Sequence, residues 1–354
     1  MFPYWAVFAV FAFAAALEKP WPEGTRAPPL PFAVTGVFLT LYIGLRYWVG
    51  GDWIEYNAQL AESAYLSFDQ VIHAQDPAYG VLNLIASRLG LSIWFVNLVC
   101  AAPFSWGLIR LARTQPRPWL IMVLAVPYLI TVVAMGYTRQ AVAIGLAMAA
   151  IADVIRGATV LRPIAYIALA TLFHKTALIL LPLLSIATGA SLVWTIAAVP
   201  PALYGLFQTF LAPSLEHLVA GYIDTQYSSS GAAIRVALVM LGGIVFLTYR
   251  GRLRFTDREA GLMRNLSFGG IGCLALLFAL PSSTVVDRLA LYLIPLELLV
   301  LARIPDVAVS DGVGKALVIG LAFAVLYVWL MHGSFSGAWI PYRNYLFELP
   351  RATL

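Results

Sequence analysis

Charged residues and cysteines are both scarce in this sequence. Only 11% of the 354 residues are charged, whereas 61% are hydrophobic, which excludes an ordinary soluble globular protein. The two cysteines, Cys100 and Cys273, lie within apolar segments, so they predict neither a disulfide framework nor a metal cluster. The net charge of +5 does not indicate a nucleic-acid partner, because membrane proteins collect Lys and Arg in cytoplasmic loops.

Long apolar runs replace the missing charge. Blocks such as VALVMLGGIVFLTY (236–249) are too continuous for the alternating strands of a β-barrel, so the pattern predicts an all-α polytopic membrane protein. The first run has its charges after it, which predicts a retained span with an outside N-terminus instead of a cleaved signal peptide. From apolar length and helix breakers we expect about twelve transmembrane segments, at 2–17, 31–49, 92–109, 118–135, 139–155, 161–173, 175–188, 191–211, 233–249, 262–280, 286–302 and 315–332.

Basic residues fall in alternate connections between these segments. One set of connections holds 14 of the 22 Lys and Arg residues with seven acids, and the opposite set holds eight basic residues and nine acids. The positive-inside rule therefore puts the first set in the cytoplasm and both termini outside. The fourteen residues are Lys19, Arg26, Arg110, Arg113, Arg117, Arg156, Arg162, Arg250, Arg252, Arg254, Arg258, Arg264, Arg303 and Lys315.

The alternation requires a break in the apolar stretch 161–187. One long helix there would invert every later loop, so the stretch must cross twice or fold back. Each half has about 13 residues, which is short for a hydrocarbon core of roughly 30 Å. We therefore expect a pair of short helices that meet at His174 and Lys175, where non-helical backbone must be buried in protein or line a wet cavity.

We expect a single transmembrane domain, 1–354, with three outside segments. They are a loop at 50–91, a loop at 212–232 and a C-terminal tail at 333–354. Within the first, DPAYGVLNLIASRLG predicts an interfacial or re-entrant amphipathic helix. Its expected apolar face consists of Tyr79, Leu82, Ile85, Ala86 and Leu89.

Ionisable residues gather at the outer ends of the expected segments. A charge within a membrane segment costs roughly 2.5 kcal/mol or more, so such residues usually line a site or a pathway. For one arginine near the interface, snorkelling to the headgroups explains the position equally well. Several guanidiniums around one cavity suit phosphate or pyrophosphate, because the planar fork donates parallel hydrogen bonds. The residues in question are Arg46, Asp52, Arg139, His174, Lys175, Arg235, Asp287 and Arg288.

Six motifs in fixed order resemble the EpsG family of bacterial exopolysaccharide proteins. They are RYWVGGDWIEY, DPAYGVLN, YTRQAVAIGLAM, TLFHKTALILLPL, DRLALYL and WIPYRN, and the resemblance covers essentially the whole chain. The set is specific, whereas no single motif is. The family residues carried over by position are Arg46, Asp52, Tyr56, Arg139, Gln140, His174 and Arg288; Lys175 is a departure, since a small or variable residue is expected after the histidine.

The resemblance implies a Wzy-like polysaccharide polymerase with a fold like the GT-C membrane glycosyltransferases. Such an enzyme joins oligosaccharide repeat units carried on undecaprenyl pyrophosphate, usually with inversion, at the periplasmic side of the bacterial inner membrane. The implied partners are the lipid-linked donor and acceptor, the bilayer, and a flippase and chain-length regulator of the same pathway. No cofactor is expected. No paired-carboxylate metal signature is present, which favours a metal-independent reaction.

The expected roles follow from residue chemistry. Arg46, Arg139, Arg235 and Arg288 would hold the donor pyrophosphate and stabilise its developing charge. Asp52 and His174 are both candidates for the catalytic base. A structural role is open for each, as a salt bridge of Asp52 to Arg46 and as a hinge contact of His174. Tyr56, Gln140 and Asp287 would orient sugar or pyrophosphate.

The sequence leaves two alternative functions, a flippase and an acyltransferase. A lipid-linked oligosaccharide flippase would want polar residues at the bilayer midplane or an inverted repeat, and neither is evident. A membrane O-acyltransferase is not excluded by a single outward His174.

Glu297, within the expected eleventh segment, would pair with another helix or tune a cavity. An interfacial belt, in preference to sugar stacking, is favoured for the outer aromatic residues, which are Trp53, Tyr56, Tyr65, Tyr79, Trp339, Tyr342 and Tyr345.

Overall fold

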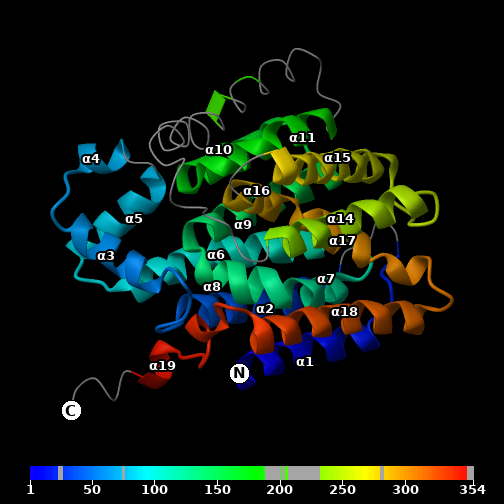
Figure 1. The fold of residues 1–354 in the computed structure, drawn as a ribbon, viewed down its shortest axis with the longest axis horizontal. Helices are drawn as coiled ribbons and strands as arrows, with labels where there is room; N and C mark the ends of the chain where they lie inside the picture. The colour runs from blue at the N-terminus through cyan, green and yellow to red at the C-terminus, as the bar shows by residue number, and fades with distance from the viewer. Residues whose placement is uncertain are drawn as a thin grey trace. The chain divides into compact units, whose positions relative to one another are not determined.

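The computed structural model describes residues 1–22, 27–73, 76–187, 200, 204–205, 232–279 and 283–348. Within them every regular element is a helix (Figure 1), and β structure is limited to an isolated bridge between Arg46 and Asn344. The predicted all-α class is therefore confirmed. The chain divides into two compact units: unit 1 is Met1–Ala149, Leu172–His174 and Lys315–Leu354, and unit 2 is Ala150–Thr171 and Lys175–Gly314.

Unit 1 holds the helices from both ends of the sequence. Aromatic contacts join its first and last long helices, because Phe323 lies 5.1 Å from Trp5 and 6.0 Å from Phe8 between ring centroids. The elements are α1 (Phe2–Leu17), α2 (Pro29–Gly44), α3 (Trp53–Ser63), α4 (Phe68–Ile72), α5 (Pro77–Arg88), α6 (Ile93–Ala112), α7 (Pro118–Ala125), the π-helix η1 (Val126–Val133), α8 (Ala134–Gly136), most of α9 (Thr138–Ile155) and of α18 (Asp311–His332), the short helix η6 (Ser336–Ala338) and α19 (Tyr345–Glu348).

Unit 2 is built around α14, which packs against α15, α16 and α17. Helix α11 also packs on α15. The elements are most of α10 (Leu161–Phe173), the 3-10 helix η2 (Lys175–Ile179), α11 (Leu180–Ala187), α14 (Ala232–Tyr249), α15 (Asp257–Ala279), α16 (Ser283–Ala290), η4 (Leu291–Leu293), α17 (Ile294–Leu301) and η5 (Ile304–Asp306).

Several helices are suited to a membrane. Five in the described residues are long and apolar enough to cross one, namely Ile93–Ala112, Pro118–Gly136, Thr138–Ile155, Asp257–Ala279 and Asp311–His332. Shorter apolar helices lie at Phe2–Leu17, Pro29–Gly44, Leu161–Phe173, Lys175–Leu184 and Ala233–Tyr249. The chain is thus a helical membrane protein. Most of the expected segment 191–211 and nearly all of the loop 212–232 lie outside the described residues, so the count of twelve stays a prediction.

The expected break at His174 is present. Helix α10 ends at Phe173, His174 is non-helical, and the chain continues in the 3-10 helix η2. The segment 118–135 contains a second interruption, which was not predicted. It is the π-helix η1, with Pro127 near its start. Proline cannot donate its backbone nitrogen, which favours irregular helix at that point. The indole Nε1 of Trp339 donates to the Thr131 carbonyl of η1 at 2.8 Å, so the C-terminal segment is fastened to the irregular turn.

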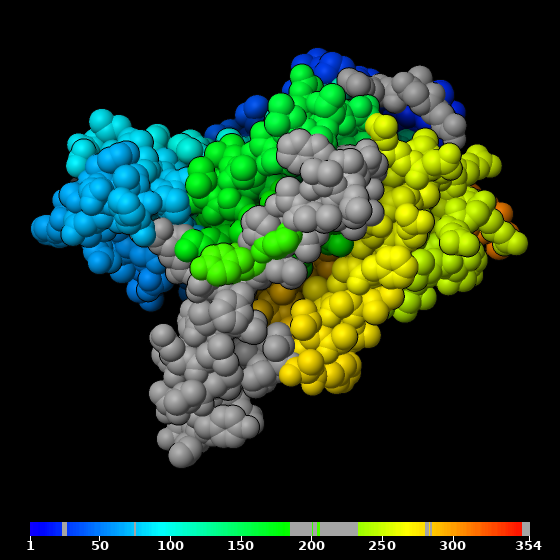
Figure 2. All heavy atoms as spheres, turned by 90° about the horizontal axis from the view of Figure 1, so that it is seen from above, coloured from blue at the N-terminus to red at the C-terminus, as the bar shows by residue number. Residues whose placement is uncertain are grey.

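The predicted amphipathic helix exists as α5, but its buried face differs from the expected one. Tyr79, Asn83, Leu84 and Ala86 are buried, whereas Ile85 is 45% exposed. Leu89, also predicted on the apolar face, is 65% exposed and follows the helix. Helices α3 and α4 cover α5, and the three helices form one continuous light-blue region of the surface (Figure 2). Tyr79 and Ala86 of the expected face are thus buried, and Asn83 lies on the same helical face at a spacing of four and three residues from them. Because the expected face contained only apolar residues, the polar Asn83 was left out of it.

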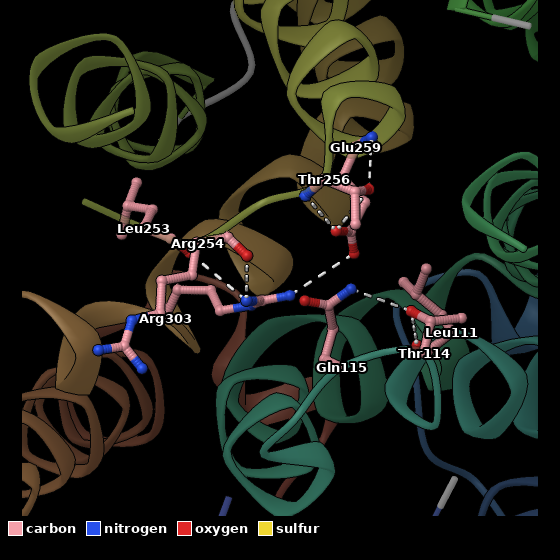
Figure 3. Close-up of polar contacts among 8 residues, drawn as sticks. All are labelled: Leu111, Thr114, Gln115, Leu253, Arg254, Thr256, Glu259 and Arg303. Carbon is pink, nitrogen blue, oxygen red and sulfur yellow. Dashed lines mark hydrogen bonds and ion pairs between the residues drawn. The ribbon is translucent and has the colours of Figure 1, made fainter. Parts of the chain in front are cut away.

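A buried arginine of unit 2 holds the connection before α15. Figure 3 shows the Arg303 guanidinium between the Arg254 carbonyl, at 2.9 Å, and the Glu259 carboxylate, at 3.6 Å. Glu259 and Thr256 form a capping box, with the Thr256 backbone N–H donating to Glu259 Oε2 at 2.9 Å. Arg303 is 5% exposed, so this residue, which was expected in a cytoplasmic connection, has structural partners within unit 2.

Helices α6 and α9 approach closely at two glycines. A Cβ at Gly107 would lie 1.9 Å from the Gly145 carbonyl oxygen, and a Cβ at Gly145 would lie 2.5 Å from the Phe104 Cα. Backbone atoms cannot yield as a side chain can, so only glycine fits at this crossing. The crossing matters because α9 begins with the residues of the candidate site.

Gly145→Ala should destabilise the protein by about 1–3 kcal/mol, because the added methyl forces the helices apart. Gly320→Ala in α18 is the matched control, since nothing lies within 4 Å of a Cβ there. Thermal unfolding in detergent checks both variants. Equal unfolding temperatures for the two would contradict the close crossing.

Candidate functional site

The site centres on an ion pair between Asp76 and Arg139 in unit 1. Asp76 precedes Pro77 as the N-cap of α5, yet its side chain does not cap the helix. Instead it accepts a hydrogen bond of 2.6 Å from Arg139 Nη1, near the start of α9. The Asp76 side chain is 6% exposed and that of Arg139 is 29% exposed. A buried carboxylate thus anchors a partly accessible guanidinium.

His174 approaches the other oxygen of the same carboxylate. Its Nδ1 lies 4.0 Å from Asp76 Oδ1, and the histidine side chain is 13% exposed. The break after α10 therefore brings His174 beside Arg139 through Asp76. Asp76 was not among the expected site residues, because an aspartate before a proline at a helix start is typical of a local cap. The motif DPAYGVLN, which begins with Asp76, was the feature of the sequence that could have identified this residue.

Two tyrosines flank Arg139. The guanidinium carbon is 5.9 Å from the ring centroid of Tyr56 and 5.8 Å from that of Tyr79. The two rings lie 5.6 Å apart, and both residues are buried. Burial is the main cause that raises the pKa of Tyr56 to about 12, with Asp52 adding to the rise and Arg139 opposing it. Burial also raises the pKa of Tyr79 well above its ordinary value. Both hydroxyls are therefore neutral and able to donate.

Asp52 lies at the edge of this group. It is the N-cap of α3 and is half-buried, and its side chain makes no capping hydrogen bond. Its carbonyl accepts from the Tyr56 backbone N–H at 2.9 Å, and its charge acts on the Tyr56 hydroxyl. Gln140 follows Arg139 in α9 and is 4% exposed. The structure thus gathers Asp52, Tyr56, Arg139 and His174 of the predicted residues in unit 1.

The guanidinium of Arg46 is enclosed within the protein. Arg46 is 1% exposed, and its guanidinium donates four hydrogen bonds within the protein. Two go to the Ile43 carbonyl at 2.9 Å and the Val49 carbonyl at 3.3 Å. The other two go to Asn97 Oδ1 at 2.9 Å and Thr138 Oγ1 at 2.7 Å. Arg46 therefore fastens the end of α2 to α6 and to the first residue of α9, next to Arg139. Neither Asn97 nor Thr138 was expected to have a role.

The remaining predicted residues belong to unit 2. Arg235 in α14 forms a two-pronged ion pair with Asp287 in α16, through Nε to Oδ1 and through Nη2 to Oδ2 at 2.6 Å. Arg288 follows Asp287 and is exposed. Asp287, expected to orient substrate, has Arg235 as a partner within the same unit.

Most of the aromatic residues that were expected at the outer face are buried within the protein or differ widely in exposure. Trp53, Tyr56, Tyr79 and Trp339 are each at most 6% exposed, so neither lipid headgroups nor sugars contact most of their surface. Tyr65 is 89% exposed. Trp48, which was not singled out, is 54% exposed and has a left-handed backbone with φ of 57°.

Arg46→Lys should lower stability by about 3 kcal/mol or more, because an ammonium has three donors and cannot reproduce a fork that spans four acceptors. Thermal unfolding in detergent measures the loss. Arg88→Lys is the control, since Arg88 is exposed at the end of α5. A stability equal to that of the control would show that the four bonds hold nothing together.

The comparisons with known proteins give one match. No curated protein and no solved structure matched the chain. The model of the EpsG family matches residues 30–344, a range that includes Arg46, Asp76, Arg139 and His174. Because the match spans nearly the whole sequence, the chain belongs to the EpsG family.

Proposed function

We propose that this protein is a polysaccharide polymerase that joins lipid-pyrophosphate-linked oligosaccharide repeat units. The observation that carries the proposal is the partly exposed Arg139 guanidinium, held by Asp76 beside His174 and the two tyrosines. A cation can stabilise a pyrophosphate leaving group and a histidine can accept a hydroxyl proton, and both kinds of group suit glycosyl transfer from a lipid pyrophosphate. Membership of the EpsG family supports the same class of substrate.

The proposed reaction is an inverting displacement. An acceptor sugar hydroxyl loses its proton to a base, and its oxygen attacks the anomeric carbon of the donor. The bond from that carbon to the pyrophosphate oxygen breaks, and the electron pair leaves with the lipid pyrophosphate. Arg139 stabilises the charge that develops on the leaving group. Asp52 and His174 both remain candidates for the base.

The roles of the other predicted residues change with their surroundings. Arg46 becomes a positioning residue, because its donors are used within the protein. Tyr56 and Gln140 keep the proposed orienting role. Arg235, Asp287 and Arg288 stay predictions from the sequence as pyrophosphate-binding and orienting groups. No metal or cofactor enters the proposed reaction.

The proposed setting is the bacterial inner membrane, with twelve segments in a GT-C-like bundle and the site on the periplasmic side. The donor and acceptor would be carried on undecaprenyl pyrophosphate, and a flippase and a chain-length regulator would act in the same pathway. The apolar helices and the family match support a membrane-bound step of exopolysaccharide synthesis.

Purified protein incubated with a lipid-linked repeat unit tests the activity directly. A ladder of lengthened products on a gel is the result expected of a polymerase. Unladdered single units that cross a vesicle membrane would instead indicate a flippase. A single unit that gains an acyl group without lengthening would indicate an O-acyltransferase.

Arg139→Ala should lower the polymerisation rate by about 10²–10³-fold, because a group that stabilises developing charge is removed. Arg88→Ala is the matched control and should keep the wild-type rate, since Arg88 lies at an exposed helix end. The lengths and amounts of product in the gel assay measure both. Full laddering by a folded Arg139→Ala variant would refute the assignment.

A further inference from the structure

Asp76 occupies the N-cap position of α5, but its carboxylate does not cap the helix. An aspartate at a helix N-cap usually accepts a hydrogen bond from a backbone N–H of the first turn, which contributes about 1 kcal/mol. In α5 that bond is absent. The Asp76 oxygens face two other groups, Arg139 Nη1 at 2.6 Å from Oδ2 and His174 Nδ1 at 4.0 Å from Oδ1. The carboxylate is thus aimed at the candidate site and away from its own helix.

This arrangement distinguishes the two nitrogens of His174. An ionised carboxylate only accepts hydrogen bonds, so a ring nitrogen that faces it is favoured as N–H. Nδ1 is the nitrogen that faces Asp76. In a neutral imidazole the other nitrogen, Nε2, then carries the lone pair and can accept a proton. A contact of 4.0 Å shortens to a hydrogen bond with a small ring movement, and such bonds commonly tighten when substrate binds.

Arg139 keeps the carboxylate in this orientation. Its short bond to Oδ2 fixes one oxygen, which leaves Oδ1 directed at the histidine. Ionisable groups close to His174 include Asp76, Arg139 through that carboxylate, and Lys175, the next residue in the chain. Asp76 is anionic, whereas Arg139 and Lys175 are cationic. Removing the Asp76 charge therefore disfavours the protonated, cationic form of the His174 ring.

We propose that Asp76 is a positioning residue that holds His174 in the Nδ1–H form and so makes His174 Nε2 the base. This inference rests on the proposed function and decides between its two base candidates. In the step, the acceptor hydroxyl gives its proton to Nε2 as its oxygen bonds to the donor's anomeric carbon. The pyrophosphate leaves with the electron pair of the broken bond. The resulting imidazolium is stabilised by Asp76 until it returns the proton to solvent.

The chain contains its own comparison pair. His73 and Asp69 are also an aspartate and a histidine, with Nδ1 and Oδ1 3.6 Å apart. Their side chains are 74% and 84% exposed, so solvent screens their interaction. Asp69→Asn therefore controls for the same chemical change at a site without burial.

Nitrogen-15 NMR of histidine-labelled protein in nanodiscs tests the inference without requiring activity. The sequence has four histidines, and His174→Gln identifies the His174 signals. Wild-type His174 should show Nδ1 protonated in its neutral form. In Asp76→Asn its titration midpoint should fall by about 1 unit or more, because a neighbouring negative charge that favours the imidazolium is lost. Asp69→Asn should leave the His174 signals unchanged.

Kinetics complete the test. Asp76→Asn should lower kcat by about 10²–10⁴-fold with KM within a few-fold of wild type. The reason is that a carboxamide N–H donates to Nδ1 and so favours the Nε2–H tautomer, which cannot accept a proton at Nε2. The acidic limb of its pH–rate profile should move to lower pH with the His174 midpoint. Asp69→Asn should keep the wild-type rate and profile.

Each outcome bears on a separate claim. An Nε2–H tautomer in wild-type protein, or equal His174 midpoints in wild type and Asp76→Asn, would overturn the role of Asp76. The wild-type tautomer decides this even where the variant fails to fold. A wild type that makes no ladder would refute the polymerase, while the NMR result would still decide how Asp76 acts on His174.

Discussion

The buried Arg46 guanidinium is the interaction on which the geometry of unit 1 depends. Burying a cation is costly, and here four hydrogen bonds to protein oxygens offset that cost. The acceptors lie at the end of α2, in the following turn, on α6 and on Thr138. Since Thr138 precedes Arg139, the same cation that joins three helices also sets where the candidate phosphate-binding arginine emerges. Helices α6 and α9 also cross closely at Gly107 and Gly145, about two turns further along α9 from Arg139. This crossing holds α9 against α6 at a second point.

The features that the sequence predicted well are those encoded locally. Apolar length alone located α1 and placed α9 and α18 within a few residues of their observed ends. The break at His174 followed from charge alternation, because a continuous helix would have inverted the later loops. The π-helix η1 escaped prediction, although Pro127 marked it, because proline inside an apolar run is compatible with several local distortions.

The features that it missed depend on distant partners. Arg46 and Arg139 look alike in the sequence, each a cation at the outer end of an apolar run. One is enclosed by Asn97 and Thr138, which are 51 and 92 residues away, and the other is paired with Asp76, 63 residues away. No local pattern distinguishes an arginine whose donors are used within the protein from one whose guanidinium stays partly accessible. Asp76 was missed for the converse reason, since its local pattern already explained it.

The pairing of cations with carboxylates limits what the site can bind and how. Arg139 and Arg235 each have an acidic partner within their own unit, Asp76 and Asp287. Next to lipid an isolated guanidinium is costly, so a site that must exist before substrate arrives needs such partners. The contact with Asp76 uses one Nη1 donor of Arg139, whereas a guanidinium has five N–H groups. Arg139 also forms a side-chain hydrogen bond with Tyr56. In the proposed reaction a pyrophosphate would bind the donors that neither Asp76 nor Tyr56 uses, and Asp76 would keep its place against His174. In that proposed reaction, the carboxylate shared between Arg139 and His174 would link leaving-group stabilisation to proton removal.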